Sequence, residues 1–114
     1  MPTTKVIRYR TKPEHADENE RLVRAVFAEL ADARPDGLHY ATFRLDDSVS
    51  FVHVAVTDSD ENPLTSSPAF AAFQAGIGER CAEGPQPADA TVIAADSGLE
   101  QAERLGLTKA TLLL

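Results

Sequence analysis

The stretch LHYATFRLDDSVSFVHVAVT, residues 38–57, decides the fold of this chain. Apolar and polar side chains largely alternate along residues 38–45 and again along residues 49–57, and this period of two is typical of β-strands. The connection between the two segments, Asp46-Asp47-Ser48, is polar and suits a tight turn. The stretch therefore predicts an antiparallel β-hairpin.

One strand and one helix are predicted before the hairpin, and one helix and one strand after it. Residues 5–10 are predicted to form the first strand in chain order and residues 89–95 the last. Apolar residues recur at helical spacing in the two segments between, namely Leu22, Val23, Val26, Phe27 and Leu30 in the first and Phe70, Phe73 and Ile77 in the second. The order β-α-β-β-α-β predicts an α+β, ferredoxin-like fold, with a four-stranded antiparallel sheet and two helices on one face.

Local signals suggest where the helices begin and end. The sequence TKPE at residues 11–14 has the capping-box pattern, and Asp17 offers a second start for the first helix. Ser67 followed by Pro68 predicts the start of the second helix. The sequence GPQP at residues 84–87 is expected to end it, because proline cannot continue a helix.

The hairpin register sorts side chains onto two faces. With Asp47 and Ser48 at the centre of the turn, Asp46 lies opposite Val49. One face is then apolar and is expected to pack against the helices, with Ala41, Phe43, Val52, Val54 and Val56. The other is mixed, with Tyr40, Thr42, Arg44, Phe51, His53 and Ala55.

The mixed face suits a partly polar contact between two sheets. We therefore predict a two-fold homodimer in which sheets pack face to face. A monomer whose C-terminal tail folds over the sheet is the alternative. The predicted domain spans residues 1–96, and residues 97–114 form a C-terminal extension with a short helix and an apolar tail.

Length and charge restrict the possible functions. The chain has 114 residues and a net charge of −7, which argues against a nucleic-acid partner, because such partners bind basic surfaces. No apolar run reaches the ~20 residues of a membrane span.

Cys81 is the single cysteine, which excludes an intrachain disulfide and fits a reducing compartment. We predict a cytoplasmic protein without membrane contact.

The chain resembles the antibiotic-biosynthesis-monooxygenase-like group of dimeric α+β barrels. The resemblance is carried by FRL at residues 43–45, SFVH at 50–53, PAF at 68–70 and FQ at 73–74. It implies a pocket between sheet and helices, and either cofactor-independent oxidation of aromatic substrates or haem degradation. The group's oxygenases commonly use an Asn and a Trp. This chain has no Trp, and Asn19 and Asn62 fall in a helix and a loop.

His53 is the strongest catalytic candidate, as a general base with Tyr40 as an orienting hydrogen-bond donor. A hydrogen-bonded place for His53 inside the dimer interface is the alternative. The residues expected to line a pocket are Tyr9, Phe27, His39, Phe70, Phe73 and Gln74. Cys81 is expected to be a small buried filler, and no metal site is predicted.

We therefore predict a small homodimer that binds a small aromatic or polyketide-like molecule in an apolar pocket. Oxidation without a tightly bound cofactor is the activity that the resemblance implies. A non-catalytic binding or stress-associated protein of the same fold is one alternative, and a haem-binding protein is the other.

Overall fold

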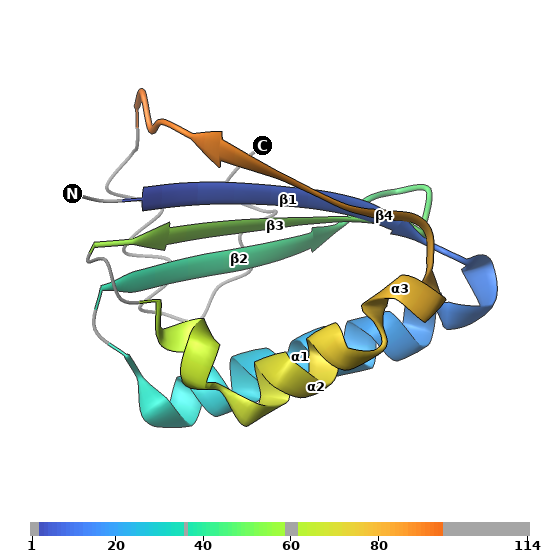
Figure 1. Ribbon diagram of the computed structural model, residues 1–114, viewed down its shortest axis with the longest axis horizontal. Helices are drawn as coiled ribbons and strands as arrows, with labels where there is room; N and C mark the ends of the chain where they lie inside the picture. The colour runs from blue at the N-terminus through green and yellow to red at the C-terminus, as the bar shows by residue number, and fades with distance from the viewer. Residues whose placement is uncertain (1–2, 36, 59–61, 95–114) are drawn as a thin grey trace.

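The computed structural model describes residues 3–35, 37–58 and 62–94, and the predicted C-terminal extension at 97–114 lies outside them. The elements are β1 (Thr3–Thr11), a 3-10 turn (Pro13–His15), α1 (Ala16–Ala33), β2 (Leu38–Arg44), β3 (Ser50–Thr57), a second 3-10 turn (Pro63–Ser66), α2 (Pro68–Ala75), α3 (Ile77–Arg80) and β4 (Cys81–Ala90). Figure 1 shows this order along the chain. The predicted ferredoxin-like α+β order is confirmed.

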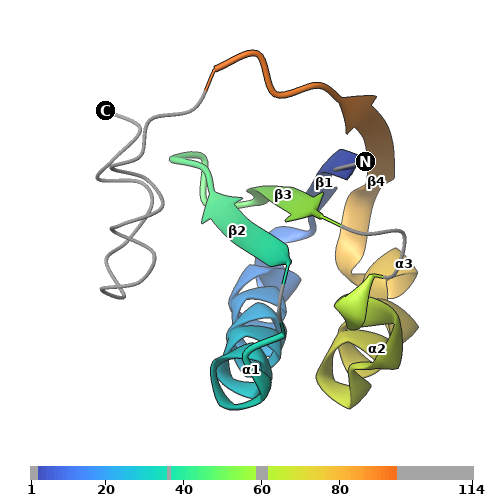
Figure 2. The ribbon, with the colours of Figure 1, turned by 90° about the vertical axis from the view of Figure 1, so that its left-hand side faces the viewer.

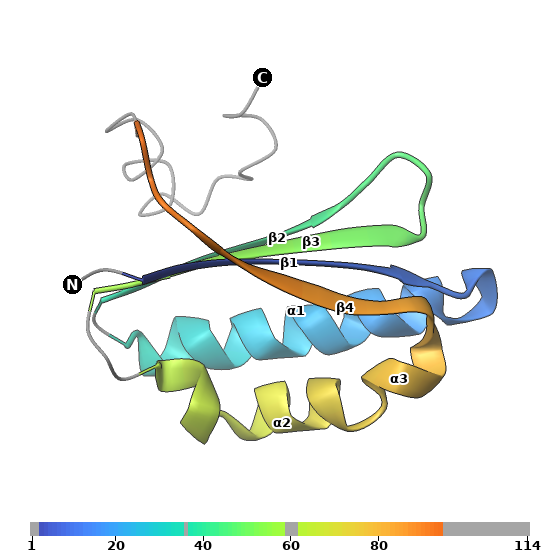
Figure 3. The same cartoon turned by 45° about the horizontal axis from the view of Figure 1, so that its top comes forward.

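The four strands form one antiparallel sheet in the order β2-β3-β1-β4. The two central strands, β3 and β1, lie side by side in the sheet although α1 and β2 separate them in the chain. Both α1 and α2 lie on the same side of the sheet, seen end-on in Figure 2 and from above in Figure 3. No helix in the described parts of the chain is both long and apolar enough to cross a membrane.

The predicted hairpin register is confirmed, with Tyr40 opposite Ala55, Thr42 opposite His53 and Arg44 opposite Phe51. The Asp47 carboxylate closes the turn. Its oxygens accept hydrogen bonds from the backbone N–H groups of the two residues that follow Ser48, at 3.0 and 2.8 Å, and from the hydroxyl of Ser50 at 2.5 Å. These bonds replace backbone pairing at the point where the chain reverses.

The prediction that the apolar face of the hairpin packs against the helices is wrong. The mixed face lies under them, and Tyr9, Phe51 and His53 are all at most 4% exposed. The polar groups of this face can be buried because they hydrogen-bond one another, while their rings pack on the apolar stripes of the helices. The open face of the sheet is instead the apolar one, with Ala41, Phe43, Val52, Val54 and Val56 half-buried.

The first helix starts later than the capping-box pattern predicts. Thr11 is the last residue of β1, and its backbone N–H and hydroxyl both donate to the carbonyl of Val49. The Thr11 hydroxyl therefore bonds within the sheet and does not cap α1, which begins at Ala16. The predicted apolar stripe is confirmed, with Val23 and Val26 buried and the rest packed on the core.

The second helix starts as predicted. Ser67 accepts a 3.0 Å hydrogen bond from the backbone N–H of Phe70. A second cap comes from α1, where Glu29 accepts a 2.9 Å bond from the N–H of Ala69. These two contacts fix the start of α2 against α1.

A last strand is present as predicted, but its predicted bounds and the predicted end of the second helical region are wrong. α2 ends at Ala75, and residues 84–87 lie inside β4 rather than in a loop. Proline is tolerated there because β4 is at the edge of the sheet that the described residues form, with β1 as its neighbour. Val92 and Ile93, expected within the last strand, follow β4 and are 53% and 96% exposed.

Candidate functional site

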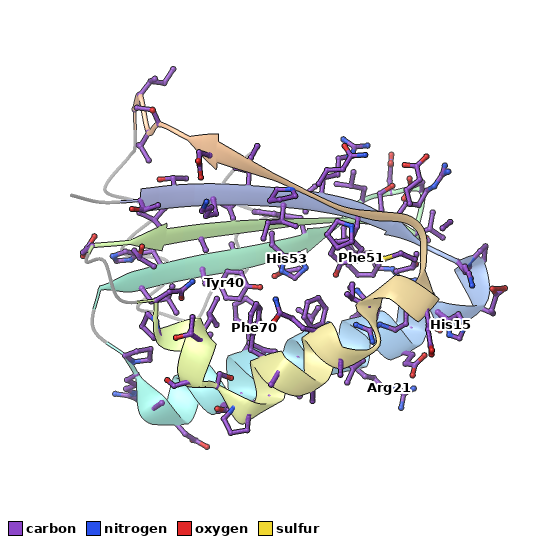
Figure 4. All side chains as sticks on the ribbon, in the orientation of Figure 1. His15, Arg21, Tyr40, Phe51, His53 and Phe70 are labelled. Atoms are coloured by element: carbon purple, nitrogen blue, oxygen red, sulfur yellow. The ribbon has the colours of Figure 1, made fainter. Side chains whose placement is uncertain are left out.

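His53 lies at the centre of a buried polar network between the sheet and the helices (Figure 4). Its Nε2 is 2.8 Å from the hydroxyl oxygen of Tyr9, on the neighbouring strand β1. Its Nδ1 is 2.5 Å from the hydroxyl oxygen of Tyr40 and 3.0 Å from that of Thr42, both on β2. The strand order β2-β3-β1 thus places hydrogen-bond partners on both sides of the imidazole.

The network continues from Tyr9 into the helices. Asn19 of α1 is fully buried and donates from Nδ2 to the Tyr9 hydroxyl oxygen across 2.8 Å. Arg80 of α3 donates from Nε to Oδ1 of Asn19 across 3.1 Å. A continuous series of hydrogen bonds therefore joins α3 and α1 to Tyr40 through His53.

Arg80 carries a buried positive charge, with only 4% of the residue exposed. Its second donor contact, 2.6 Å from a terminal nitrogen, is the carbonyl of Phe73. That carbonyl lies near the C-terminus of α2, where the helix dipole is negative. The guanidinium also lies over the ring of Phe73, 5.3 Å from its centroid. These contacts stabilise the charge where no ion pair to Arg80 occurs among the described residues.

Sequence reasoning missed Asn19 and Arg80 as members of the site. One signal for Asn19 was present, because it precedes Val23 by four residues and Val26 by seven and so continues the apolar stripe of α1. A polar side chain in phase with such a stripe is buried and needs partners. Arg80 offered no comparable signal, since its burial depends on the break between α2 and α3.

Burial controls the charge of the titratable groups. Desolvation lowers the pKa of His53 from 6.5 to about 4, so the imidazole is neutral at pH 7. The same cause raises the pKa of Tyr40 to about 12 and raises the pKa of Tyr9 further. At neutral pH the network is therefore a set of uncharged donors and acceptors with one cation, Arg80, at its far end.

Aromatic rings surround the Tyr40–His53 pair. Phe27 of α1 stacks on Tyr40 with 4.9 Å between ring centroids and 17° between planes. Phe73 of α2 lies 5.4 Å from the imidazole centroid, and Phe70 stacks on Phe73 at 5.9 Å. Phe27, Phe70 and Tyr40 are only partly buried, so the rim of this aromatic cluster reaches the surface.

The structure brings most of the predicted site residues together. Tyr9, Phe27, Phe70 and Phe73 lie with Tyr40 and His53 on the helix side of the sheet.

Two predicted pocket residues lie elsewhere. His39 is on the open face, paired across the strands with Val56, and its Nε2 is 3.9 Å from Oδ2 of Asp58. It cannot share a pocket with Tyr40, because side chains of adjacent strand residues point to opposite faces. Gln74 is exposed on α2.

Groups that could bind a metal are dispersed. Within residues 3–35, 37–58 and 62–94, no three His, Cys, Asp or Glu side chains gather as a metal site would require. His15 contacts Glu18 of the same helical segment at 3.0 Å. Cys81 is buried, and desolvation raises the pKa of its thiol, which disfavours the reactive thiolate.

Solved structures share this fold. Rv0793 from Mycobacterium tuberculosis is 18% identical, with a TM-score of 0.68 over 83% of this chain and 98% of that one. A provisionally assigned antibiotic biosynthesis monooxygenase from Bacteroides thetaiotaomicron is 12% identical, with a TM-score of 0.70 over 82% and 90%. A variant of SnoaB, a cofactor-independent oxygenase from Streptomyces nogalater, is 18% identical, with a TM-score of 0.62 over 82% and 95%.

The chain matches no protein-family model and no curated protein in sequence. The structural likenesses confirm the fold that the resemblance to antibiotic-biosynthesis-monooxygenase-like proteins implied. At these identities they show the fold alone.

Proposed function

We propose that this chain binds a small aromatic or polyketide-like molecule beside Tyr40, between the sheet and the helices, and oxidises it with molecular oxygen and no bound cofactor. The observation that carries the proposal is the Tyr40–His53 contact, a polar pair set among aromatic rings. Apolar walls with a few convergent polar groups are typical of small-molecule sites. The likeness in fold to a cofactor-independent oxygenase adds support.

Tyr40 is the residue best placed to touch such a ligand. It is partly exposed, whereas His53 and Tyr9 are buried behind it. Its neutral hydroxyl can donate a hydrogen bond to a carbonyl oxygen, and Phe27 offers an aromatic surface beside it.

A hydrogen bond to a substrate carbonyl supplies useful chemistry. Loss of a proton from a neighbouring CH2 group gives an enolate, and a donor at the enolate oxygen stabilises it. The enolate is electron-rich and can reduce oxygen directly. In the balanced reaction CH2 + O2 gives C=O + H2O, with one oxygen atom retained in the product and the other released as water.

The role of His53 as a general base stays a prediction. Its neutral state at pH 7 suits a base. Both of its ring nitrogens, however, contact tyrosine hydroxyls, so a substrate proton would have to reach the imidazole through Tyr40. An orienting role for His53 toward Tyr40 needs no such transfer.

We also propose that the chain acts as a homodimer whose open sheet faces pack together. Support comes from the composition of that face, where Val52, Val54 and Val56 line the centre of β3 beside Phe43. An apolar sheet face is unfavourable in water unless something covers it. The polar residues expected at this interface lie on the helix side, so the interface we propose is more apolar than the sequence suggested. A cytoplasmic location stays a prediction.

Non-catalytic binding at the same site is the second candidate. It is favoured by the extent of hydrogen bonding around His53, which leaves neither nitrogen facing outward. The same geometry gives little support to haem ligation by His53, because an iron ligand needs a free imidazole lone pair.

Oxygen consumption with anthrone tests the proposal. Anthrone carries one carbonyl and one CH2 group and would give anthraquinone and water. We expect binding of anthrone and a rate above the protein-free background that Tyr40→Phe lowers. Binding without turnover would favour the second candidate, and absence of binding would overturn both.

A further inference from the structure

The buried guanidinium of Arg80 is held in one place by several independent contacts. Its Nε donates to Oδ1 of Asn19 across 3.1 Å, and its Nη2 donates to the carbonyl of Phe73 across 2.6 Å. Gly76 leaves the space that the group occupies, since a Cβ at that position would lie 3.0 Å from Nη1 of Arg80. The cation is therefore a fixed reference point for the polar groups beside it.

Arg80 determines which way the side-chain amide of Asn19 is turned. A guanidinium carries hydrogen-bond donors and no acceptor, so the atom of Asn19 that faces Nε must be the carbonyl oxygen. The amide nitrogen then faces the hydroxyl oxygen of Tyr9 at 2.8 Å and donates to it. Turning the amide by 180° would place donors against the guanidinium and leave both groups unpaired, although Asn19 is fully buried.

The hydroxyl of Tyr9 transmits this direction to His53. Within the described residues, the hydroxyl has two hydrogen-bond partners, the Asn19 amide and Nε2 of His53 at 2.8 Å. Because the amide donates, the hydroxyl hydrogen of Tyr9 must be accepted by a lone pair on Nε2. A proton on Nε2, in the other neutral tautomer or in the imidazolium, would leave that hydrogen without an acceptor in the core, where Tyr9 is 3% exposed.

The proton of the imidazole is then on the other ring nitrogen. A neutral imidazole that accepts at Nε2 carries its hydrogen on Nδ1. Nδ1 of His53 is 2.5 Å from the hydroxyl oxygen of Tyr40 and 3.0 Å from that of Thr42, so its N–H donates toward β2. Tyr40 is partly exposed, and Figure 4 shows it beside His53. The imidazole therefore presents a donor, and not a lone pair, to the side of the site that is nearer the surface.

We propose that Arg80, Asn19 and Tyr9 are positioning residues that hold His53 in the Nδ1–H tautomer, and that His53 acts as a hydrogen-bond donor to β2 and not as a general base. A base needs a lone pair directed at the proton that it removes, and the lone pair of this tautomer faces Tyr9 in the core. The inference goes beyond the proposed function, because it describes the free protein and holds with or without turnover. If the proposed oxidation occurs, the substrate proton leaves by a route other than transfer to His53.

Proton–nitrogen NMR correlations of the histidine rings test the tautomer in the free wild-type chain at neutral pH, because they distinguish a protonated ring nitrogen from an unprotonated one. The His53 signals are identified by their absence from the spectrum of His53→Gln. We expect the proton on Nδ1. A proton on Nε2, or an equal mixture of the two tautomers, would overturn the inference, whereas a failure to bind or oxidise an aromatic ligand would count against the proposed function alone.

Asn19→Asp tests whether Arg80 and Asn19 set the tautomer. The new carboxylate pairs with Arg80 and can only accept, so the Tyr9 hydroxyl should donate to it and should accept from Nε2–H of His53. We therefore expect the His53 proton to move from Nδ1 to Nε2. Asn62→Asp is the matched control, because its side-chain oxygen accepts from the N–H of Leu64 in a separate turn and should leave the proton on Nδ1.

A proton that stays on Nδ1 in folded Asn19→Asp would overturn the positioning role of Asn19 and Arg80. A purely structural role for Asn19 predicts that result, since loss of stability by itself does not move a proton between the two ring nitrogens.

Discussion

Nε of Arg80 lies 3.1 Å from Oδ1 of Asn19, and this contact joins α3 to α1 inside the core. It is also the start of the hydrogen-bond series that ends at Tyr40. The stability of the fold and the geometry of the site therefore both depend on Arg80 and Asn19. A substitution of either residue should change both properties.

Arg80→Met should lower the free energy of unfolding by about 2–4 kcal/mol. The change leaves the Asn19 oxygen and the Phe73 carbonyl unpaired in the core, at about 1–3 kcal/mol for each unsatisfied group. Urea unfolding measures the loss. Arg24→Met is the control. In the part of the chain that the structure describes, Arg24 makes one exposed contact, with Glu20, so this variant should change stability by less than about 0.5 kcal/mol. Equal losses in the two variants would contradict the role given to Arg80.

Acid should weaken the native state through His53. Its pKa is about 4 in the folded chain against 6.5 when solvated, so between these pH values the unfolded chain binds a proton that the native chain does not. The free energy of unfolding should therefore fall as the pH falls through this window, by about 3 kcal/mol, and should be fully recovered above it.

His53→Gln removes the titration but keeps a donor and an acceptor. We expect its stability, measured by urea unfolding at several pH values, to lack the His53 contribution in this window. His15→Gln is the matched control, because His15 is partly exposed and its one side-chain partner within the described residues is Glu18. A His53→Gln variant whose stability falls as steeply as that of the wild-type chain would show that His53 is not the titrating group.

Ser67→Ala should destabilise the chain by about 1 kcal/mol, since it removes the side-chain cap of the Phe70 N–H at the start of α2. Thermal unfolding reports the change. Ser66→Ala serves as the comparison, because the exposed Ser66 hydroxyl donates to the carbonyl of Pro63 and caps no helix. If both substitutions have the same small effect, the Ser67 cap contributes little.

Val54→Lys tests the proposed dimer. A charge at the centre of the open sheet face should prevent two such faces from packing, because a buried unpaired ammonium is strongly unfavourable. Light scattering should give a dimer mass for the wild-type chain and a monomer mass for the variant. Ala72→Lys, on the exposed side of α2, should remain dimeric. A monomeric wild-type chain rules out the proposed interface.

The sequence predicted the hairpin more reliably than it predicted the environment of its two faces. Alternation and the acidic turn were sufficient to pair Thr42 with His53. They could not show which face the helices cover, because an apolar face can pack on helices or on a second sheet. The choice depended on whether Tyr40 and His53 could satisfy their polar atoms when buried. The network that allows this also includes Tyr9 of β1, Asn19 of α1 and Arg80 of α3.

The same limit explains the errors around β4. Pro85 and Pro87 are typical of a loop, and only the position of β4 at the sheet edge makes them compatible with a strand. Position in the sheet depends on the whole topology and not on local sequence. Ser67 shows the opposite case, since a helix cap depends on a few neighbouring residues and was predicted correctly.

Binding between the sheet and the helices is tested by an NMR titration of the uniformly labelled chain with 9-fluorenone, which locates the bound ligand on one face of the sheet or the other. We expect the largest chemical-shift changes on the helix side, at Phe27, Tyr40, His53 and Phe70. Changes confined to Val52, Val54 and Val56 on the open face would contradict it.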